Sequence, residues 1–235
     1  MSEAPTRRRR LRDEATAQIK AVALALMRDG GPGAITLRAI AREMGMTAGA
    51  VYGYFPTRDD LISTLIRELY ESLVASVEAA RDARPEPDAA GRMLAWAEAF
   101  RAWSLANPEG FRLVYGDPVP GYRPPPGGPA PDAERRACAG LTGLVAAAWP
   151  TAAARHADPG HRWADFAPEL VAEVRAGFPD LPPAGLALAL RCWGRMHGPV
   201  ALEVHGQLAG QTSRPAALYR AEILDLLDSL GLAHP

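Results

Sequence analysis

Apolar side chains recur at every third or fourth position through most of this chain, in segments that glycine and proline interrupt. The first segment covers residues 10–29, and the sequence "DGGPG" at 29–33 ends it. This period places the apolar residues on one face of an α-helix, and glycine and proline are common where helices end. No segment shows the strict alternation of apolar and polar residues that marks a half-buried strand. We therefore predict an all-α fold.

The same spacing predicts a series of further helices. Two short helices are expected near residues 36–44 and 47–55, and Thr57 is a good N-cap for a long helix with acidic residues in its first turn. Later helices are expected at 88–106, 108–115, 132–155, 168–178, 183–208 and 214–230. Residues 116–131, "GDPVPGYRPPPGGPAP", are too rich in proline and glycine for a regular element, so we predict a long loop.

The chain is nearly neutral overall but basic at its N-terminal end. Its 235 residues carry a net charge of −1. Up to residue 58 there are ten basic and five acidic side chains, a net charge of +5, which leaves −6 for the remainder. Such an asymmetry is typical of a protein that binds a polyanion at one end. A basic arm that is only solvated has the same composition, so charge alone leaves both interpretations open.

Several kinds of site are not predicted. Cys138 and Cys192 form neither a disulfide framework nor a CxxC pair, and His197 and His205 lack a neighbouring carboxylate cluster, so we expect no metal and no cofactor. No nucleophile elbow, phosphate loop or HExxH motif is present, so we expect no enzymatic activity. The apolar runs are short and broken, so we expect no membrane segment and a cytoplasmic protein.

Residues 35–62, "ITLRAIAREMGMTAGAVYGYFPTRDDLI", predict a helix-turn-helix. Gly45 lies at the turn, where a residue without Cβ tolerates the left-handed conformation, and Ala41 leaves room for the two helices to approach. The second helix opens with small residues, including Ala48 and Gly49, so its backbone can lie close to the floor of a DNA major groove. The alternative is a tight helical corner without a role in DNA binding.

Hydroxyl and guanidinium groups around the second helix have the chemistry for phosphate contacts. We expect Tyr52 and Tyr54 to reach phosphates that flank the groove. Arg58 and Thr36 each lie at the start of a helix, where backbone N–H groups also attract anions. Such contacts position a protein on DNA without reading its sequence.

Base recognition needs other side chains. Arg38 is the best candidate for bidentate recognition of guanine, and Thr47 and Ala48 are weaker readers. A solvated helix charge is the alternative role for Arg38. We expect Val51 and Phe55 to point away from DNA, into the core of the domain.

The quoted run closely resembles the DNA-binding domain of the tetracycline-repressor-like (TetR) family. The resemblance implies a homodimer that binds double-stranded DNA at an operator with two-fold related half-sites. It also implies a DNA-binding domain at 1–56 and a larger helical ligand-binding and dimerisation domain at 57–235. Matching positions imply DNA contacts at Thr36, Arg38, Thr47, Ala48, Gly49, Tyr52, Tyr54 and Arg58. Two positions depart from the family pattern, because Arg58 stands where lysine is usual and Gly53 where a bulkier residue is common.

A second resemblance lies near the C-terminus. Residues 191–208, "RCWGRMHGPVALEVHGQL", are similar to the Trp-His-Gly signature of a C-terminal domain found in some of these regulators. Residues 107–122 also fit that subgroup. The resemblance places the chain in a subgroup but does not name its ligand.

An aromatic set predicts the site of a small-molecule effector between helices. Its members are Trp96, Phe100, Trp103, Trp193, Met196 and His197. Large aromatic side chains with one polar group are typical of such sites. Plain core packing is the alternative for each aromatic residue, and His197 also fits a hydrogen-bonded histidine between helices.

The last predicted helix carries an apolar stripe that suits a dimer interface. The stripe consists of Tyr219, Ile223, Leu226, Leu227 and Leu230. Together with the preceding helix it can form a four-helix interface across a two-fold axis, and burial within one chain is the alternative.

These observations predict a ligand-responsive transcriptional regulator. We expect a repressor that a small, mostly apolar effector releases from its operator by moving the helix that begins after Thr57. A helical protein-interaction module without sequence-specific DNA binding is the alternative, and a helical enzyme is a further rival. A steep salt dependence of DNA binding separates the first reading from the module.

Overall fold

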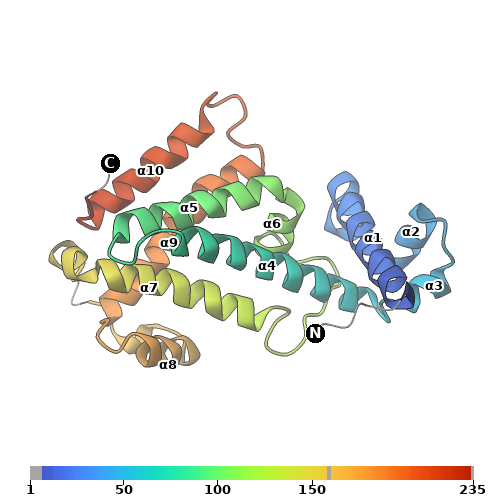
Figure 1. The fold of residues 1–235 in the computed structure, drawn as a ribbon, viewed down its shortest axis with the longest axis horizontal. Coiled ribbons are helices and arrows are strands. Elements are labelled where there is room, and N and C mark those ends of the chain that lie inside the picture. Colours follow the sequence, from blue (N-terminus) through green and yellow to red (C-terminus); the bar gives the residue numbers. More distant parts are fainter. Residues whose placement is uncertain (1–6, 158–159, 234–235) are drawn as a thin grey trace. The chain divides into compact units, whose positions relative to one another are not determined.

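The computed structural model describes residues 7–157 and 160–233, and within those residues the regular elements are helices, with no strand (Figure 1). The predicted all-α fold is confirmed. The first six residues of the basic arm lie outside the described part of the chain. The α-helices are α1 (Arg7–Gly30), α2 (Leu37–Glu43), α3 (Ala48–Tyr52), α4 (Arg58–Asp82), α5 (Ala89–Ala106), α6 (Pro108–Tyr115), α7 (Pro131–His156), α8 (Pro168–Gly177), α9 (Pro183–Val204) and α10 (Pro215–Ser229).

The chain folds into two compact units, each built from separate stretches of sequence. The N-terminal unit consists of the residues up to Tyr70 together with Pro108–Pro131, and the C-terminal unit consists of Glu71–Asn107 and the residues from Asp132 onward. A domain boundary after residue 56 was expected, whereas the compact units divide the chain at other positions. The first half of α4 and the segment 108–131 pack with the helix-turn-helix, which a contiguous division of the sequence cannot represent.

The core of the N-terminal unit is built from apolar side chains of α1, α2, α3 and α4. Side chains that are fully buried include Ile19 of α1, Ile40 of α2, Val51 of α3 and both Leu61 and Ile62 of α4. Burying each such side chain stabilises the fold by about 1.5–3 kcal/mol. The inward orientation predicted for Val51 is confirmed, so the opposite face of α3 is left for the surface.

The turn between α2 and α3 has the geometry predicted for a helix-turn-helix. Gly45 adopts a φ of 64°, in the left-handed region that glycine occupies without steric cost. The amide of Met46 donates to the carbonyl of Ala41 at 2.9 Å, which satisfies a carbonyl at the end of α2. Ala41 is only 3% exposed, so its small side chain permits the close packing of the two helices.

Segment 116–131 contains no helix or strand before its last residue, as its composition predicts. The segment belongs to the N-terminal unit, which the composition did not indicate. Val119 is 5% exposed and packs into the same core as α1, α2 and α4. The phenolic oxygen of Tyr122 lies 2.9 Å from the hydroxyl of Ser63 in α4. The backbone amide of Arg123 donates to Asp59 at 3.3 Å. This loop is therefore held at its first half by the apolar contact of Val119 and by polar contacts with α4.

The C-terminal unit packs α5 against α9 and α10. The hydroxyl of Tyr219 in α10 donates to the carbonyl of Ala97 in α5 at 2.9 Å. Arg101 of α5 donates to both carboxylate oxygens of Glu203 in α9, at 2.8 and 2.7 Å. The two side chains of this ion pair are 20% and 15% exposed, so water screens the pair less than it screens a surface pair. These contacts fix the three helices to one another.

The apolar stripe of α10 is buried within its own chain. Its five side chains, Tyr219, Ile223, Leu226, Leu227 and Leu230, are each at most 3% exposed. The stripe was expected to face a second copy of the protein, and that expectation has to be corrected, because α5 and α9 already cover it. The intramolecular alternative describes this face of the helix.

Helix α7 is long and apolar enough to cross a membrane when judged by length and composition alone. This differs from the expectation that no such segment exists, although a buried helix of a globular domain passes the same test. Val145, Ala148 and Ala152 are at most 1% exposed and belong to the core of the C-terminal unit. The apolar composition of α7 is thus explained by packing.

Candidate nucleic-acid interface

Two threonines cap the helices of the helix-turn-helix. The hydroxyl oxygen of Thr36 accepts from the amide of Ala39 at 3.1 Å, and that of Thr47 accepts from the amide of Ala50 at 3.2 Å. Both threonines are exposed. Because each hydroxyl uses only an acceptor position in the cap, its hydrogen is still available to an external acceptor such as a phosphate oxygen.

The outer face of α3 consists of small side chains followed by a tyrosine. Gly49 is exposed, and a Cβ placed on it meets no other atom within 4 Å. Packing within the protein therefore gives no reason for glycine at this position, whereas close approach to another molecule does. Ala48 is half-buried, and Tyr52 is 46% exposed. This face is accessible to a duplex, as the small residues predict.

Arg38 lies on the exposed side of α2. Within the residues that the structure describes, its side chain forms no ion pair or hydrogen bond, whereas Arg42 on the same helix has Glu43 at 3.9 Å. Burial and internal pairing thus leave the guanidinium of Arg38 available for an external acceptor. Both sequence interpretations, a base contact and a solvated charge, are compatible with this position.

Tyr54 is held in place by an arginine from α1, a contact that the sequence alone did not predict. The guanidinium carbon of Arg12 lies 5.2 Å from the centre of the Tyr54 ring, which is within the range of a cation–π contact. Arg12 also donates to the carbonyl of Gly53 at 3.1 Å. Tyr54 is half-buried and packs against the core of the unit. The run of arginines in the sequence was the only available signal for this contact.

Arg58, for which a phosphate contact is expected, also forms hydrogen bonds within its own chain. Its guanidinium donates to three backbone carbonyls, those of Ile35 at 2.5 Å, Pro120 at 3.0 Å and Pro32 at 3.4 Å. These bonds join the start of α4 to the segment before α2 and to the loop 116–131. Three of the five N–H donors of Arg58 thus point at carbonyls of its own chain, and the phosphate contact stays a prediction. Neither its position after Pro56 nor its match to the family pattern indicates these partners.

The start of α4 is fixed by a reciprocal cap. The amide of Thr57 donates to the carboxylate of Asp60 at 3.0 Å, and the amide of Asp60 donates to the hydroxyl of Thr57 at 3.0 Å. This confirms Thr57 as the N-cap residue. Together, this cap and the hydrogen bonds of Arg58 fix the residue at which α4 begins.

The aromatic set expected around an effector is divided between two surroundings. The indole N–H of Trp103 donates to the hydroxyl of Ser72 in α4 at 3.1 Å, and Trp103 is 7% exposed. Trp96 is 4% exposed and packs against Gly140 of α7, where an added Cβ would lie 2.5 Å from the indole ring. Both tryptophans thus contact α4 or α7 and fit the core-packing alternative.

The remaining members of the set meet between α5 and α9. The ring centres of Phe100 and Trp193 are 5.4 Å apart in an edge-to-face arrangement, and those of Trp193 and His197 are 5.0 Å apart. Met196 is 1% exposed. Burial lowers the pKa of His197 below its ordinary value of 6.5, and the charge of His205 lowers it further. The neutral imidazole is therefore favoured near neutral pH.

No group of three or more His, Cys, Asp or Glu side chains that could hold a metal ion occurs among the residues the structure describes. Cys192 is buried, and burial raises the pKa of its thiol to about 11. A thiol with such a pKa remains protonated at neutral pH, so it is a poor nucleophile and a poor metal ligand.

The chain is similar in sequence and fold to bacterial regulatory proteins. A profile described as "Bacterial regulatory proteins, tetR family" matches residues 19–65, and one described as "Tetracyclin repressor-like, C-terminal domain" matches residues 93–226. The HTH-type transcriptional regulators Rv1816 of Mycobacterium tuberculosis and Mb1846 of Mycobacterium bovis are each 32% identical over 224 residues, which cover 92% of this chain and 92% of theirs.

Solved structures agree with this similarity. The crystal structure of the regulatory protein SCO4313 has a TM-score of 0.75 and 33% sequence identity, and the match covers 96% of this chain and 100% of that one. A bacterial regulatory protein in the tetR family from Rhodococcus RHA1 has a TM-score of 0.66 at 22% identity, covering 94% of this chain and 98% of that one. The second match shows a shared fold only.

Proposed function

The chain belongs to the TetR family of transcriptional regulators, which are non-enzymatic DNA-binding proteins, and on that basis we propose that it is a ligand-responsive repressor. In this proposal a homodimer binds an operator with two-fold related half-sites and leaves it when a small, mostly apolar effector binds. The proposed location is the cytoplasm, where the operator DNA of a bacterial cell is found.

The observation that carries the proposal is the exposed face of α3. Gly49 has open space where a side chain would be, and Tyr52 stands at the far end of the same short helix. We propose that this face enters the major groove, with Thr47 and Ala48 near base edges and Tyr52 at a phosphate. Thr36 and Arg38 contact DNA from α2. Arg58 is left out of the proposed contacts because three of its five N–H donors are used within the chain.

A dimer requires a surface other than the buried stripe of α10. Three large apolar side chains on α9 and α10 are exposed, namely Leu190 at 46%, Leu202 at 43% and Leu218 at 51%. We propose that these outer faces of α9 and α10 form the two-fold interface. Exposed leucines on neighbouring helices are costly in water, and a second copy of the chain removes that cost.

The effector is proposed to bind beside Phe100, Trp193 and His197. These three rings contact one another between α5 and α9, and His197 supplies a polar group within an otherwise apolar cluster. The two buried tryptophans, Trp96 and Trp103, are assigned to packing in this proposal. Because the effector site and α3 belong to different units, the response to the effector requires a conformational change that both sites influence.

Selection of duplexes from a random-sequence pool with the purified protein tests the proposal. The expected result is enrichment of a sequence with two-fold symmetry and half-sites about one helical turn, or a multiple of it, apart. Binding of the selected duplex should weaken steeply between about 50 and 200 mM salt, because phosphate contacts release counterions. A pool that yields no enriched sequence after repeated rounds favours the interaction module instead.

A further inference from the structure

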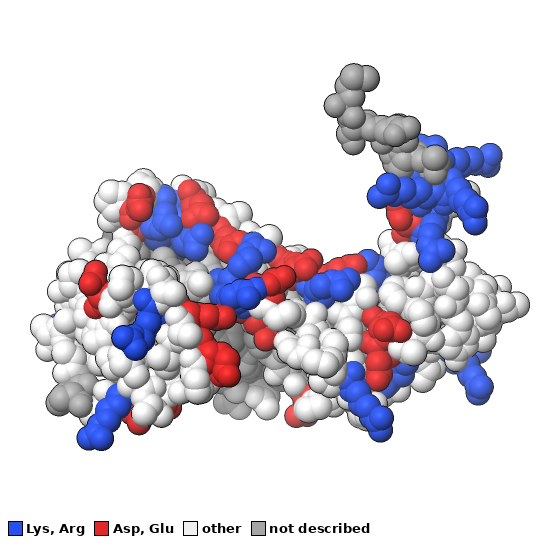
Figure 2. All heavy atoms as spheres, turned by 90° about the horizontal axis from the view of Figure 1, so that it is seen from below, with Lys and Arg blue, Asp and Glu red and all other residues white. Residues whose placement is uncertain are grey.

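The first turns of α1 carry a concentrated positive charge that the fold does not neutralise. Arginines occupy positions 7–10 and 12, all exposed, and Figure 2 shows basic side chains gathered at the start of this helix. Within the described residues none of these arginines has an acidic partner. Some other basic side chains of the unit do have acidic partners, since Lys20 pairs with Glu68 and Arg28 has Asp29 at 3.6 Å.

This charge lies at the end of the helix where it is least favourable. The N-terminus of a helix has a partial positive charge from the peptide dipoles, so cations there are destabilising. Arg8 and Arg12 are also four residues apart, on one face, where like charges repel. The first turn contains no acidic residue. An external anion is therefore expected to stabilise this part of α1.

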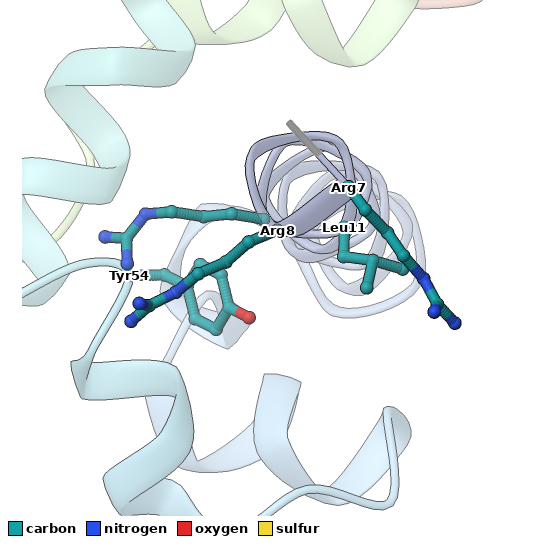
Figure 3. Close-up of a pocket in the computed structure, with 5 residues that line it drawn as sticks. Arg7, Arg8, Leu11 and Tyr54 are labelled. Atoms are coloured by element: carbon teal, nitrogen blue, oxygen red, sulfur yellow. The ribbon is translucent and has the colours of Figure 1, made fainter. Parts of the chain in front are cut away.

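The arginines line an open hollow next to the recognition element. The hollow has a volume of about 560 Å³ and is lined by Arg7, Arg8, Leu11, Arg12 and Tyr54. In Figure 3 the side chains of Arg8 and Tyr54 are drawn on one side of the helix and that of Arg7 on the other, with Leu11 between them. Leu11 is 56% exposed and offers an apolar contact in the middle of a basic surface.

We propose that Arg7, Arg8, Arg12, Leu11 and Tyr54 form a second DNA-backbone surface, which binds phosphates outside the base pairs faced by α3. The guanidinium groups contact phosphates, and Leu11 packs on deoxyribose, the apolar part of the backbone. Tyr54 belongs to this surface because Arg12 holds its ring. The proposal rests on the proposed DNA binding and extends it to the flanks of each half-site.

Continuity with α3 favours DNA over other polyanions. Arg12 donates to the carbonyl of Gly53, the residue that directly follows α3. The hollow and the outer face of α3 are therefore joined through residues 53–54 within one unit. The hollow therefore adjoins the end of α3 at which a DNA strand held by Tyr52 would leave the groove. A membrane surface is flat and needs no such connection with a groove-binding helix.

The test compares two lengths of the selected operator, one ending at the half-sites and one with about six further base pairs on each side. The wild-type protein is compared with the double variant R7A/R8A and with the control R28A, an exposed arginine at the other end of α1. On the longer duplex, R7A/R8A is expected to lower the slope of log affinity against log salt by about two, roughly one for each phosphate that is no longer bound. R28A is expected to leave the slope unchanged.

The flanks provide the decisive comparison. Trimming them should weaken binding of the wild-type protein and of R28A, but should leave R7A/R8A almost unaffected, because that variant no longer binds the flanking phosphates. An equally large weakening in all three proteins would overturn the proposal. So would an unchanged salt slope for R7A/R8A together with weaker binding to phosphatidylserine vesicles, which would assign the surface to a membrane.

The variant Gly49→Leu separates this proposal from the proposed function. If Gly49→Leu fails to bind the short duplex while R7A/R8A behaves like the wild-type protein on the long one, only the second surface is refuted. If Gly49→Leu binds both duplexes like the wild-type protein, the placement of α3 in the groove is refuted. Hydrogen exchange of residues 7–12 gives an independent readout, since the long duplex should slow it in the wild-type protein.

Discussion

The candidate DNA-binding residues and the candidate effector residues differ in what their side chains contact. In the N-terminal unit Gly49, Tyr52 and Arg38 are exposed and accessible to another molecule. In the C-terminal unit Trp96 and Trp103 are buried and satisfied by neighbours on α4 and α7. A surface residue without an internal partner is informative about function, whereas a buried aromatic residue explains its own presence through packing. A substitution at an exposed residue of the N-terminal unit should therefore reduce DNA binding without reducing stability. A substitution at a buried tryptophan of the C-terminal unit should reduce stability.

The largest effect on function is expected from Gly49→Leu. A side chain at this position meets nothing within the protein, so the melting temperature should stay the same or rise slightly, since glycine is a poor helix former. The same side chain prevents close approach to the major groove, so specific DNA binding should be abolished. Anisotropy titrations and thermal melting check both outcomes, with Gly49→Ala as the milder control. Operator binding at wild-type affinity would mean that α3 does not lie as deep in the groove as proposed.

The largest effect on stability is expected from Trp103→Ala. Removing this buried indole leaves a cavity and removes its hydrogen bond to Ser72, and should lower the free energy of unfolding by about 3–5 kcal/mol. Denaturant unfolding measures the change. Trp103→Phe is the matched control, because it keeps an aromatic ring and removes only the hydrogen-bonding N–H side of the indole. If Trp103→Ala changed stability only slightly but strongly reduced the response to an effector, Trp103 would be assigned to the effector site and not to packing.

A smaller decrease in stability is expected from Arg58→Gln. Three carbonyls lose a charged donor, but Arg58 is only half-buried and water can replace part of these bonds, so the loss should be about 1.5–3 kcal/mol in total. The N-terminal unit should melt earlier while the salt slope of DNA binding stays the same. Arg67→Gln, an exposed position on the same helix, should change neither. If the slope of log affinity against log salt fell by about one, Arg58 would instead be assigned to a phosphate contact.

The smallest effect is a pH dependence that arises from His197. Burial lowers its pKa in the folded protein, so below the ordinary value of 6.5 the unfolded chain binds a proton that the folded chain does not. Stability from this residue is therefore fully present above pH 6.5 and decreases as the pH falls toward the lowered pKa. Urea unfolding at about pH 7.5 and about pH 5.5, on either side of the ordinary pKa, should show this decrease, and His197→Gln should reduce it. An identical pH dependence in the variant would place the titrating group elsewhere.

The features that the sequence predicts correctly depend on local spacing. The helical period, the turn at Gly45 and the cap at Thr57 each follow from residues within a few positions of one another, and the structure confirms all three. The inward side of α3 follows in the same way from Val51.

The features that the sequence did not predict depend on partners distant along the chain. Arg58 meets the carbonyl of Pro120, and Arg12 meets Tyr54, although no local pattern connects these residues. The stripe of α10 illustrates the same limit, because an apolar face at helical spacing is equally suited to its own chain and to a second copy. A sequence specifies that such a face is buried, but not which surface covers it.

The position of Val119 in the N-terminal core has a consequence for the protein during its synthesis and for any fragment of it. A chain that ends after α4 contains the whole helix-turn-helix but lacks Leu113 and Val119, which are 7% and 5% exposed in the complete unit. Each missing side chain removes about 1.5–3 kcal/mol of burial and leaves apolar surface open to water. The DNA-binding unit is therefore completed only after α5 and α6 have left the ribosome. A stable truncated version should be made by joining residues 7–70 to 108–123 through a short flexible linker.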